Sequence, residues 1–233
     1  MLRLDLAIIA EVREAAAAIA KLTDRVDVLI NNAGGTSRER RVTSEGNEAT
    51  FSGNYLGHFV LTNELLPLLR HAAKFADKGQ TRILNVSSVA HEYTPGLDWD
   101  DLQSIAHFDV DKAYTNAKLA NLLHAQALAR RVKNDGIVVH AMHPGIVATN
   151  FVTHGNDAMA KTFVDFADIT VSPVEGADTL IWLATSRDTT LMEGGGYFHA
   201  RTAVPTAAAA NDDAAAERLW SESLRLTTEG RLD

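Results

Sequence analysis

Short apolar runs alternate along this chain with longer segments whose apolar residues recur every three or four positions. The short runs are rich in Val, Ile and Leu, which predicts buried strands at 26–30, 81–86 and 137–142. The longer segments have the helical period, so we expect helices at 5–22, 59–76, 114–132 and 174–184. Strands and helices that alternate in this way predict a parallel sheet with helices on both faces, a Rossmann-like doubly wound α/β fold.

The C-terminal part of the chain is less regular. Three glycines at 194–196 predict a turn into a short strand at Tyr197 and Phe198, and the Ala-rich stretch 207–216 predicts a solvated connection into a terminal helix at 217–226. The stretch 151–172 is longer than an ordinary connection, which predicts a substrate-binding loop or else a variable surface loop. Because no Pro/Ser-rich linker divides the chain, we expect one domain over residues 1–233.

Composition narrows the class of protein. No apolar run approaches the ~20 residues of a membrane span, so we expect no such span. Asp and Glu outnumber Lys and Arg by 30 to 22, a net charge of −8, which argues against a nucleic acid partner. There is no cysteine, which excludes disulfides and thiolate catalysis, and the nine histidines lack metal-site spacing, so we expect no metal. Without a signal peptide, a cytoplasmic location is expected.

The most informative pair of polar residues is Tyr114 and Lys118. Residues four apart on a helix share a face, so the ammonium group should lie beside the phenol. A nearby cation stabilises phenolate, and we therefore expect the pKa of Tyr114 to lie below its usual value of about 10. Such a tyrosine can act as a general acid and base near neutral pH.

Polar or glycine-containing turns follow three of the expected strands. The segment 31–34 is Asn-Asn-Ala-Gly, Ser87 and Ser88 follow the second run, and His-Pro-Gly-Ile-Val-Ala-Thr at 143–149 follows the third. The carboxyl ends of parallel strands lie at one edge of a sheet, where open α/β sheets bind their ligands. Together with the helix that carries Tyr114, these turns predict a ligand site at this edge.

These segments resemble the short-chain dehydrogenase/reductase family and, in detail, its retinol-dehydrogenase-type branch. The matching segments are 31–34, 54–59, 85–88, 114–121, 144–149, 172–177 and 196–198. The resemblance extends over essentially the whole chain. It implies hydride transfer between NAD or NADP and the carbon of a small lipophilic alcohol or carbonyl compound, in which the protein positions the reactants and moves a proton.

The resemblance also implies roles for single residues. Tyr114 matches the family's proton donor and acceptor, and Ser88 matches the residue that orients the substrate oxygen. Lys118 matches the residue that binds the nicotinamide ribose and lowers the tyrosine pKa, and Asn54 matches the one that anchors a water in the proton relay. Besides Tyr114 and Lys118, the residues that match cofactor contacts are Asp5, Leu6, Asn32, Ala33, Gly34, Pro144, Gly145, Val147 and Thr149.

One expected part of the family pattern is missing. The family begins with a strand and a Gly-rich turn into a helix, whose N-terminus holds the pyrophosphate, and this sequence contains no such turn. Aligned by motif, the chain starts at the family's third strand, 2–5, about 60 residues into the fold at ~30 residues per βα unit. We therefore expect an N-terminally truncated sheet with 26–30 at an exposed edge, and low stability or weak dinucleotide affinity.

Several alternatives remain open at this level. The acidic or basic residue that distinguishes NAD from NADP lies at the end of the family's second strand, so the preference cannot be read. A non-catalytic truncated product or interaction module would keep the same residues without binding dinucleotide. The stripe of Leu119, Leu122 and Leu123 predicts core packing or, alternatively, the interface of a homo-oligomer.

Overall fold

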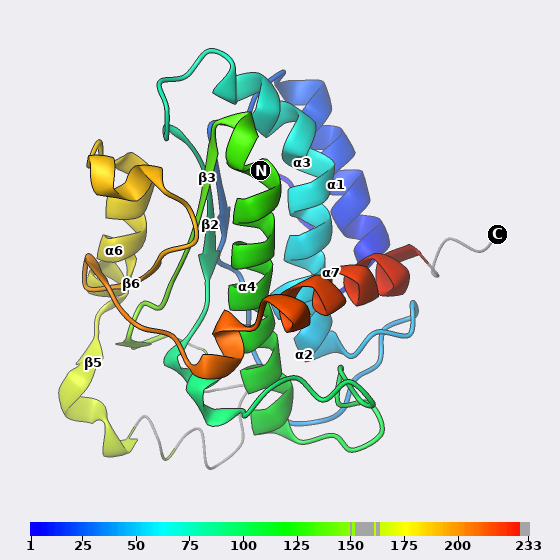
Figure 1. The fold of residues 1–233 in the computed structure, drawn as a ribbon. Helices are drawn as coiled ribbons and strands as arrows, with labels where there is room; N and C mark the ends of the chain where they lie inside the picture. Colours follow the sequence, from blue (N-terminus) through cyan, green and yellow to red (C-terminus); the bar gives the residue numbers. More distant parts are fainter. Residues whose placement is uncertain (150, 152–160, 162–163, 229–233) are drawn as a thin grey trace.

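The computed structural model describes residues 1–149, 151, 161 and 164–228, which are built around a central sheet (Figure 1). Among these residues the sheet has five strands in the order β1-β2-β3-β6-β7. The strands are β1 Val28–Asn31, β2 Thr81–Val86, β3 Ile137–Met142, β6 Tyr197–His199 and β7 Thr202–Ala203. The first four run parallel and β7 is antiparallel to β6. The expected parallel α/β sheet is thus confirmed.

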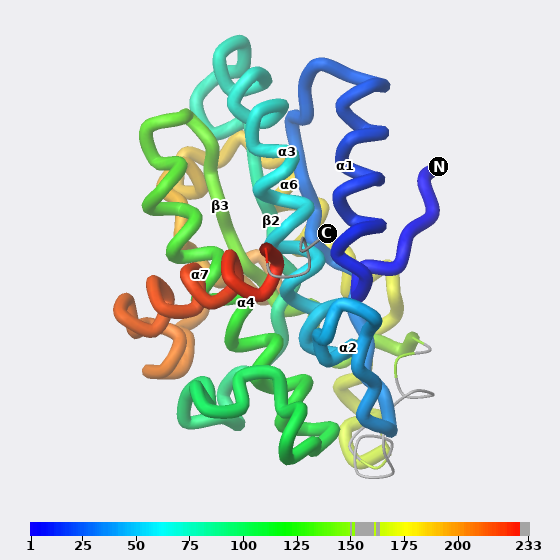
Figure 2. Tube along the Cα trace, turned by 90° about the vertical axis from the view of Figure 1, so that its right-hand side faces the viewer, coloured from blue at the N-terminus to red at the C-terminus, as the bar shows by residue number. Residues whose placement is uncertain are grey.

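Helices cover both faces of the sheet, as Figures 1 and 2 show. One face carries α1 Ile9–Leu22, α3 Gly57–Ala73 and α4 Val110–Val132, with α7 Asp213–Thr228 lying across α4, and the other face carries α6 Pro173–Thr185. Neighbouring residues of β2 belong to different cores, because side chains alternate along a strand: Ile83 packs in the larger core and Leu84 in the smaller one, with Leu183 of α6. The fold is therefore doubly wound.

The remaining elements are short. They are α2 Ala49–Phe51, a π-helical turn Ser52–Leu56, a small sheet of β4 Ile146–Val147 and β5 Thr170–Val171, and the 3-10 turns Val89–Tyr93, Lys133–Asp135, Ala167–Ile169, Thr189–Met192 and Ala208–Asn211. Half of the expected substrate-binding loop 151–172, namely 152–160 and 162–163, lies outside the described residues. Its last part, β5, pairs with β4 and so lies beside the segment that follows β3.

The strands and helices that were expected from apolar patterning form with small shifts. β2 and β3 have the predicted bounds, because all six residues of each are buried. The first strand lies two residues later than expected at its start and one at its end, at Val28–Asn31. The helix predicted at 59–76 spans 57–73, and α4 starts four residues before Tyr114, because the Asp109 side chain accepts the Lys112 N–H and caps the helix.

The N-terminal expectations were wrong in two places. Residues 2–5 form no strand, because no described strand lies beside them to supply hydrogen bonds. The first helix begins at Ile9 and not at residue 5. Its first N–H groups, on Ile9 and Ala10, donate to the two carboxylate oxygens of Glu45 at 2.6 and 2.8 Å. A side chain 35 positions away in sequence thus caps α1.

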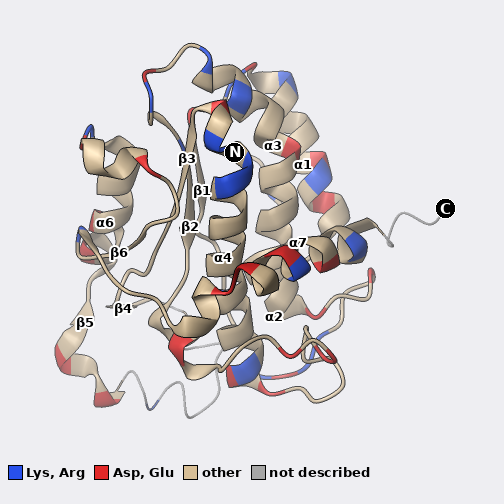
Figure 3. Cartoon of the chain, in the orientation of Figure 1, with Lys and Arg blue, Asp and Glu red and all other residues tan. Residues whose placement is uncertain are grey.

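The C-terminal connection was predicted only in part, since residues 208 and 211–214 are exposed as expected. Within 207–216, Ala210 and Ala216 are fully buried, and the terminal helix begins at residue 213 and runs to 228, beyond both predicted ends. This helix packs on α4, and Arg131 joins the two by an ion pair with Glu217 on the charged outer surface (Figure 3). The stripe of Leu119, Leu122 and Leu123 is buried within the chain, which confirms core packing; a homo-oligomer stays a prediction.

Candidate active site

The turns after β1, β2 and β3 lie at one edge of the sheet. Asn31 at the end of β1 pairs with Asn85 in β2, and Val86 pairs with Met142 at the end of β3. The N–H of Ser87 also donates to the Met142 carbonyl at 2.7 Å. The segments 32–35, 87–88 and 143–145 therefore leave the sheet side by side, as the sequence predicts.

Tyr114 lies on the second turn of α4, where its hydroxyl meets that of Ser88. The Ser88 side chain lies close enough to the phenol to favour phenolate and so to lower the pKa of Tyr114. Ser88 is held in turn by the 3-10 segment Val89–Tyr93, since its side chain caps the N–H of Ala90 at 3.1 Å. Two hydroxyl groups from different elements thus converge at one point of the sheet edge.

Lys118 is buried one turn further along α4. Its Nζ donates to the Val86 carbonyl at 3.3 Å, and the Ser87 hydroxyl donates to the main-chain carbonyl of Lys118 at 2.7 Å. The Nζ lies 5.4 Å from the centroid of the Tyr114 ring. These bonds tie α4 to the end of β2 and hold the ammonium group beside the tyrosine.

Burial sets the protonation of this pair. It raises the pKa of Tyr114 to about 12, and the nearby Ser88 side chain offsets only part of that shift. Burial likewise lowers the pKa of Lys118 to about 8. The expectation of a lowered tyrosine pKa was therefore wrong for this structure. Removing the phenolate from water destabilises it by more than its polar neighbours stabilise it.

Asn54 lies in the middle of the π-helical turn between α2 and α3, an irregularity that is frequent at functional sites. Its side chain binds the backbone of Gly35 on both sides: Oδ1 accepts the N–H at 3.2 Å and Nδ2 donates to the carbonyl at 2.7 Å. The turn comes so close that a Cβ on Gly34 would lie 2.4 Å from Oδ1 of Asn54. The same Cβ would lie 3.6 Å from Nζ of Lys118, so this turn, Asn54 and Lys118 meet.

Two side chains that hold Asn54 had no separate role among the sequence-based expectations. Its main-chain carbonyl accepts hydrogen bonds from Nδ1 of His58 and Nδ2 of Asn121, each at 3.1 Å. Burial lowers the pKa of His58 to about 4, so its ring is neutral at pH 7. The spacing of four between Asn54 and His58 was a usable signal, because such residues are neighbours on a helix.

The remaining residues expected to contact the cofactor flank this centre. The Leu6 carbonyl touches Gly57, next to the π-helical turn, and the exposed Asp5 accepts the Ala7 N–H at 2.9 Å. Asn32, Ala33 and Gly34 are exposed in the turn after β1, and Pro144, Gly145 and Val147 are partly buried after β3. Thr149 is exposed and accepts the N–H of Phe151, whose ring lies 5.1 Å from that of Tyr114.

The described residues fit one end of a dinucleotide better than the other. At the nicotinamide end, Lys118 is a buried ammonium group with three donors, and Val86 takes one of them. A pyrophosphate needs free N–H groups at a helix N-terminus. The described helices α1, α2, α4, α6 and α7 have acidic side chains there instead, which are Glu45, Glu48, Asp109, Glu175 and Asp212. These carboxylates repel phosphate, so the described residues offer the pyrophosphate no such site.

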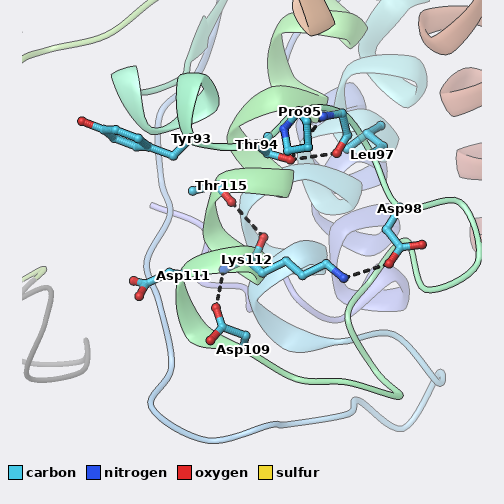
Figure 4. A pocket seen from close by; sticks show the side chains of 10 residues that line it. Tyr93, Thr94, Pro95, Leu97, Asp98, Asp109, Asp111, Lys112 and Thr115 are labelled. Atoms are coloured by element: carbon cyan, nitrogen blue, oxygen red, sulfur yellow. Dashed lines mark hydrogen bonds and ion pairs between the residues drawn. The ribbon is translucent and has the colours of Figure 1, made fainter.

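A separate open cavity of about 670 Å³ lies at the N-terminal end of α4 (Figure 4). Its wall includes three carboxylates, of Asp98, Asp109 and Asp111, and Lys112 forms an ion pair with Asp98 at 2.8 Å. Tyr114 and Ser88 do not line it. The cavity is therefore separate from the two hydroxyls of the candidate site.

Comparison with known proteins places the chain in a family. The model of the short chain dehydrogenase family matches residues 1–160. Human retinol dehydrogenase 13 is 37% identical over 229 residues, an alignment that covers 96% of this chain and 67% of that protein. The chain spans about two thirds of the length of the curated relatives it matches.

Solved structures of other proteins have the same fold. The crystal structure of an uncharacterised protein from Mycobacterium paratuberculosis superposes with a TM-score of 0.70 at 31% identity, covering 97% of this chain and 74% of that one. The RhlG/NADP active-site complex of Pseudomonas aeruginosa gives a TM-score of 0.62 at 27% identity, with 83% and 72% covered. The family model and the relatives define an oxidoreductase that uses NAD or NADP. The chain belongs to the short-chain dehydrogenase family.

Proposed function

We propose that this chain interconverts a lipophilic alcohol and its carbonyl compound, with Tyr114 as general acid and base. The observation that carries the proposal is the approach of the Ser88 side chain to the Tyr114 phenol, close enough to lower its pKa, with the ammonium group of Lys118 5.4 Å from the tyrosine ring. Proton transfer needs a donor within hydrogen-bond reach of the reacting oxygen, and two hydroxyls at one point supply a donor and an orienting group.

Each residue then has a defined task. When bound, the nicotinamide supplies or accepts the hydride. In reduction, the Tyr114 hydroxyl gives its proton to the substrate oxygen, and in oxidation it takes that proton back. Ser88 holds the same oxygen by a hydrogen bond. Lys118 uses its remaining N–H donors to hold the ribose hydroxyls and favours the phenolate that forms.

Asn54 has two proposed tasks, one in the proton relay and one in fixing the turn at Gly35. A carbonyl oxygen has two lone pairs, and His58 and Asn121 already use both on Asn54. The relay role of Asn54 therefore requires a water either to replace one of these donors or to bind the second lone pair of Oδ1, which accepts the Gly35 N–H. Independently of the relay, its side chain fixes the turn at Gly35, where we place Asn32, Ala33 and Gly34 against the nicotinamide half of the cofactor.

The substrate class follows from the surroundings of the two hydroxyls. Val89, which directly follows Ser88, is 38% exposed, and Phe151 packs against the Tyr114 ring. Apolar side chains beside the reacting oxygen favour an apolar substrate. Several curated relatives are named retinol dehydrogenases, in agreement with a lipophilic alcohol or aldehyde. The proposal also includes three further parts: residues 151–172 bind the substrate, the protein is cytoplasmic, and it forms a homo-oligomer.

A second function is favoured by one observation, the carboxylates at the helix N-termini. If no described helix can hold a pyrophosphate, a chain that keeps the catalytic residues can still fail to bind dinucleotide, as a non-catalytic interaction module would.

Within the part of the chain that the structure describes, every helix is too short or too polar to span a membrane.

Binding and turnover separate the two functions. The fluorescence of NADPH and of NADH is titrated with the chain, and oxidation of the bound nucleotide is followed with all-trans-retinal and with decanal. We expect saturable binding and turnover of at least one aldehyde. In the Tyr114→Phe variant, turnover should fall by about 100-fold or more with the nucleotide Kd unchanged. Tyr93→Phe, at an exposed tyrosine, is the control and should behave as wild type. Absence of saturable binding of either nucleotide would favour the non-catalytic module.

A further inference from the structure

His91 is a buried histidine that the catalytic roles above do not use. Its side chain is fully buried, three residues after Ser88 in the 3-10 segment Val89–Tyr93. The ring touches the edge of Tyr197 in β6, with centroids 5.3 Å apart and planes at 84°. A buried imidazole has two polar nitrogens that need partners, and here both have backbone partners.

The two hydrogen bonds of His91 join distant parts of the chain. Its Nδ1 lies 2.7 Å from the main-chain carbonyl of Ser88, and its Nε2 lies 3.2 Å from the N–H of Ala207. Ala207 directly precedes the 3-10 turn Ala208–Asn211, which leads into α7. One side chain thus connects the residue that meets Tyr114 to the C-terminal segment that covers α4.

The pattern of partners fixes the tautomer. An amide N–H can only donate, so Nε2 must accept and carry no proton. In the neutral ring the proton then resides on Nδ1, which donates it to the Ser88 carbonyl. The bond to Ala207 therefore orients the ring and keeps Nδ1 protonated for Ser88.

We propose that His91 is a positioning residue for Ser88, holding its main chain so that the Ser88 hydroxyl meets Tyr114. This inference rests on the proposed function, since it concerns the same pair of hydroxyls. The physical reason is that Ser88 directly follows a strand, and its rotamer can be reproducible only if its backbone is fixed. His91 supplies that constraint from one side, and the bond from Ser87 to the Met142 carbonyl supplies it from the other.

His140 offers a matched control. It is also buried, and its nitrogens also bind backbone groups, at 2.9 Å to the Leu191 carbonyl and 3.2 Å to the Gly196 N–H. It packs against Phe198, whose side chain belongs to the core under α6. Replacing either histidine by phenylalanine keeps a ring and removes two backbone hydrogen bonds, but only His91 touches Ser88.

The test compares His91→Phe, His91→Asn and His140→Phe in the full chain. With NADPH and all-trans-retinal we expect His91→Phe to lower kcat by about 100-fold, the cost typical of a ~1 Å displacement in a catalytic site. The nucleotide Kd should stay within twofold. His91→Asn keeps a donor near the position of Nδ1, so it should recover a large part of kcat, and His140→Phe should lose stability but keep kcat. Equal losses of kcat in His91→Phe and His140→Phe, or no recovery in His91→Asn, would overturn the proposal.

Two measurements by nuclear magnetic resonance need no turnover. We expect the imidazole nitrogen shifts of His91 to show the Nδ1–H tautomer at pH 7. The Cζ shift of Tyr114 should change in His91→Phe and stay unchanged in His140→Phe. If wild type shows no turnover, the proposed function fails, and these two signals still decide the positioning role. An Nε2–H tautomer, or a Tyr114 signal that does not respond to His91→Phe, would contradict it.

Discussion

The ammonium group of Lys118 lies over the ring of Tyr114, 5.4 Å from its centroid, while it donates to the carbonyl of Val86. A cation over an aromatic face is attracted to the ring whether or not the hydroxyl is ionised. Burial opposes the charge of both groups, since it raises the pKa of Tyr114 to about 12 and lowers that of Lys118 to about 8. Within the usual range of assay pH, Lys118 is therefore the member of the pair that titrates.

A pH profile tests this assignment. As the pH rises through about 8, Lys118 loses its proton, whereas Tyr114 keeps the proton that reduction requires. We expect kcat/KM for reduction of all-trans-retinal by NADPH to fall above about pH 8. Lys118→Met should be less active throughout and lack this break, and Lys112→Met should retain it. A break that persists in Lys118→Met would show that another group is responsible.

The two adjacent glycines after β1 should respond differently to alanine. In Gly34→Ala the new Cβ would lie 2.4 Å from Oδ1 of Asn54, so Asn54 must move away from the Gly35 backbone that it binds. In Gly35→Ala the Cβ meets nothing within 4 Å. We expect about a 100-fold loss of kcat in Gly34→Ala, as for a ~1 Å displacement, and near-normal kinetics in Gly35→Ala. Similar kinetics for the two variants would exclude a role for the Asn54 contact.

His124 should make the fold sensitive to acid. It is buried among Tyr55, Phe59 and Trp220, and neither ring nitrogen has a hydrogen-bond partner. Burial, chiefly, lowers its pKa in the folded chain to about 3, against about 6.5 in the unfolded chain. Between these values the unfolded chain binds the proton and the folded chain does not, so the free energy of unfolding falls as the pH drops below about 6.5. His58, with a pKa of about 4, acts in the same direction.

Removing His124 should reduce that sensitivity. In His124→Leu we expect a shallower loss of stability between pH 6 and about 4, measured by urea unfolding, because one titrating group is gone. At pH 7 the variant should be more stable by about 1–3 kcal/mol, since two unpaired buried nitrogens are removed. An unaltered slope in His124→Leu would rule out this source of acid sensitivity.

Arg82 should contribute strongly to the attachment of α6. Its buried guanidinium donates to the carbonyls of Leu183 and Ser186 at the end of α6, and to that of Gly79 at 2.7 Å. Arg82→Met leaves these carbonyls without a donor, which should lower the free energy of unfolding by about 3 kcal/mol.

A surface arginine gives the comparison. Arg70 pairs with Asp135 at 2.8 Å, and both side chains are substantially exposed. Arg70→Met should cost less than about 1 kcal/mol, as exposed ion pairs do. Equal effects of the two substitutions in urea unfolding would refute the structural role of Arg82.

Much of the sheet could be predicted because its strands are continuous apolar runs. β2 and β3 are buried on both faces, so their patterns end where the strands end. Residues 2–5 were expected to form a strand from alignment with the family motifs, but a strand also needs a neighbour, and that depends on tertiary structure. The early start of α4 was readable after all, since Asp109 is a typical N-cap residue.

The proximity of the candidate residues could be predicted, and the protonation of Tyr114 could not. Strand ends and the spacing of four indicated that Ser88, Tyr114 and Lys118 lie together, as they do in the structure, while their roles stay a prediction. The direction of the Tyr114 pKa shift was wrong, because the depth of burial is not written in local sequence. Glu45 at the N-terminus of α1, and His91 at Ala207, make contacts between residues far apart in sequence, and no local pattern indicates such contacts.

The two edge strands of the sheet, β1 and β7, differ in whether a further strand could pair with them. At one end, β7 is an exposed strand of two residues, too short to serve as a template for another. At the other end, among the described residues, β1 bonds β2 alone and leaves Ile30 42% exposed. A further strand, whatever chain it belongs to, would therefore add beside β1, and the same event would decide whether Ile30 is shielded from water or becomes a point of self-association.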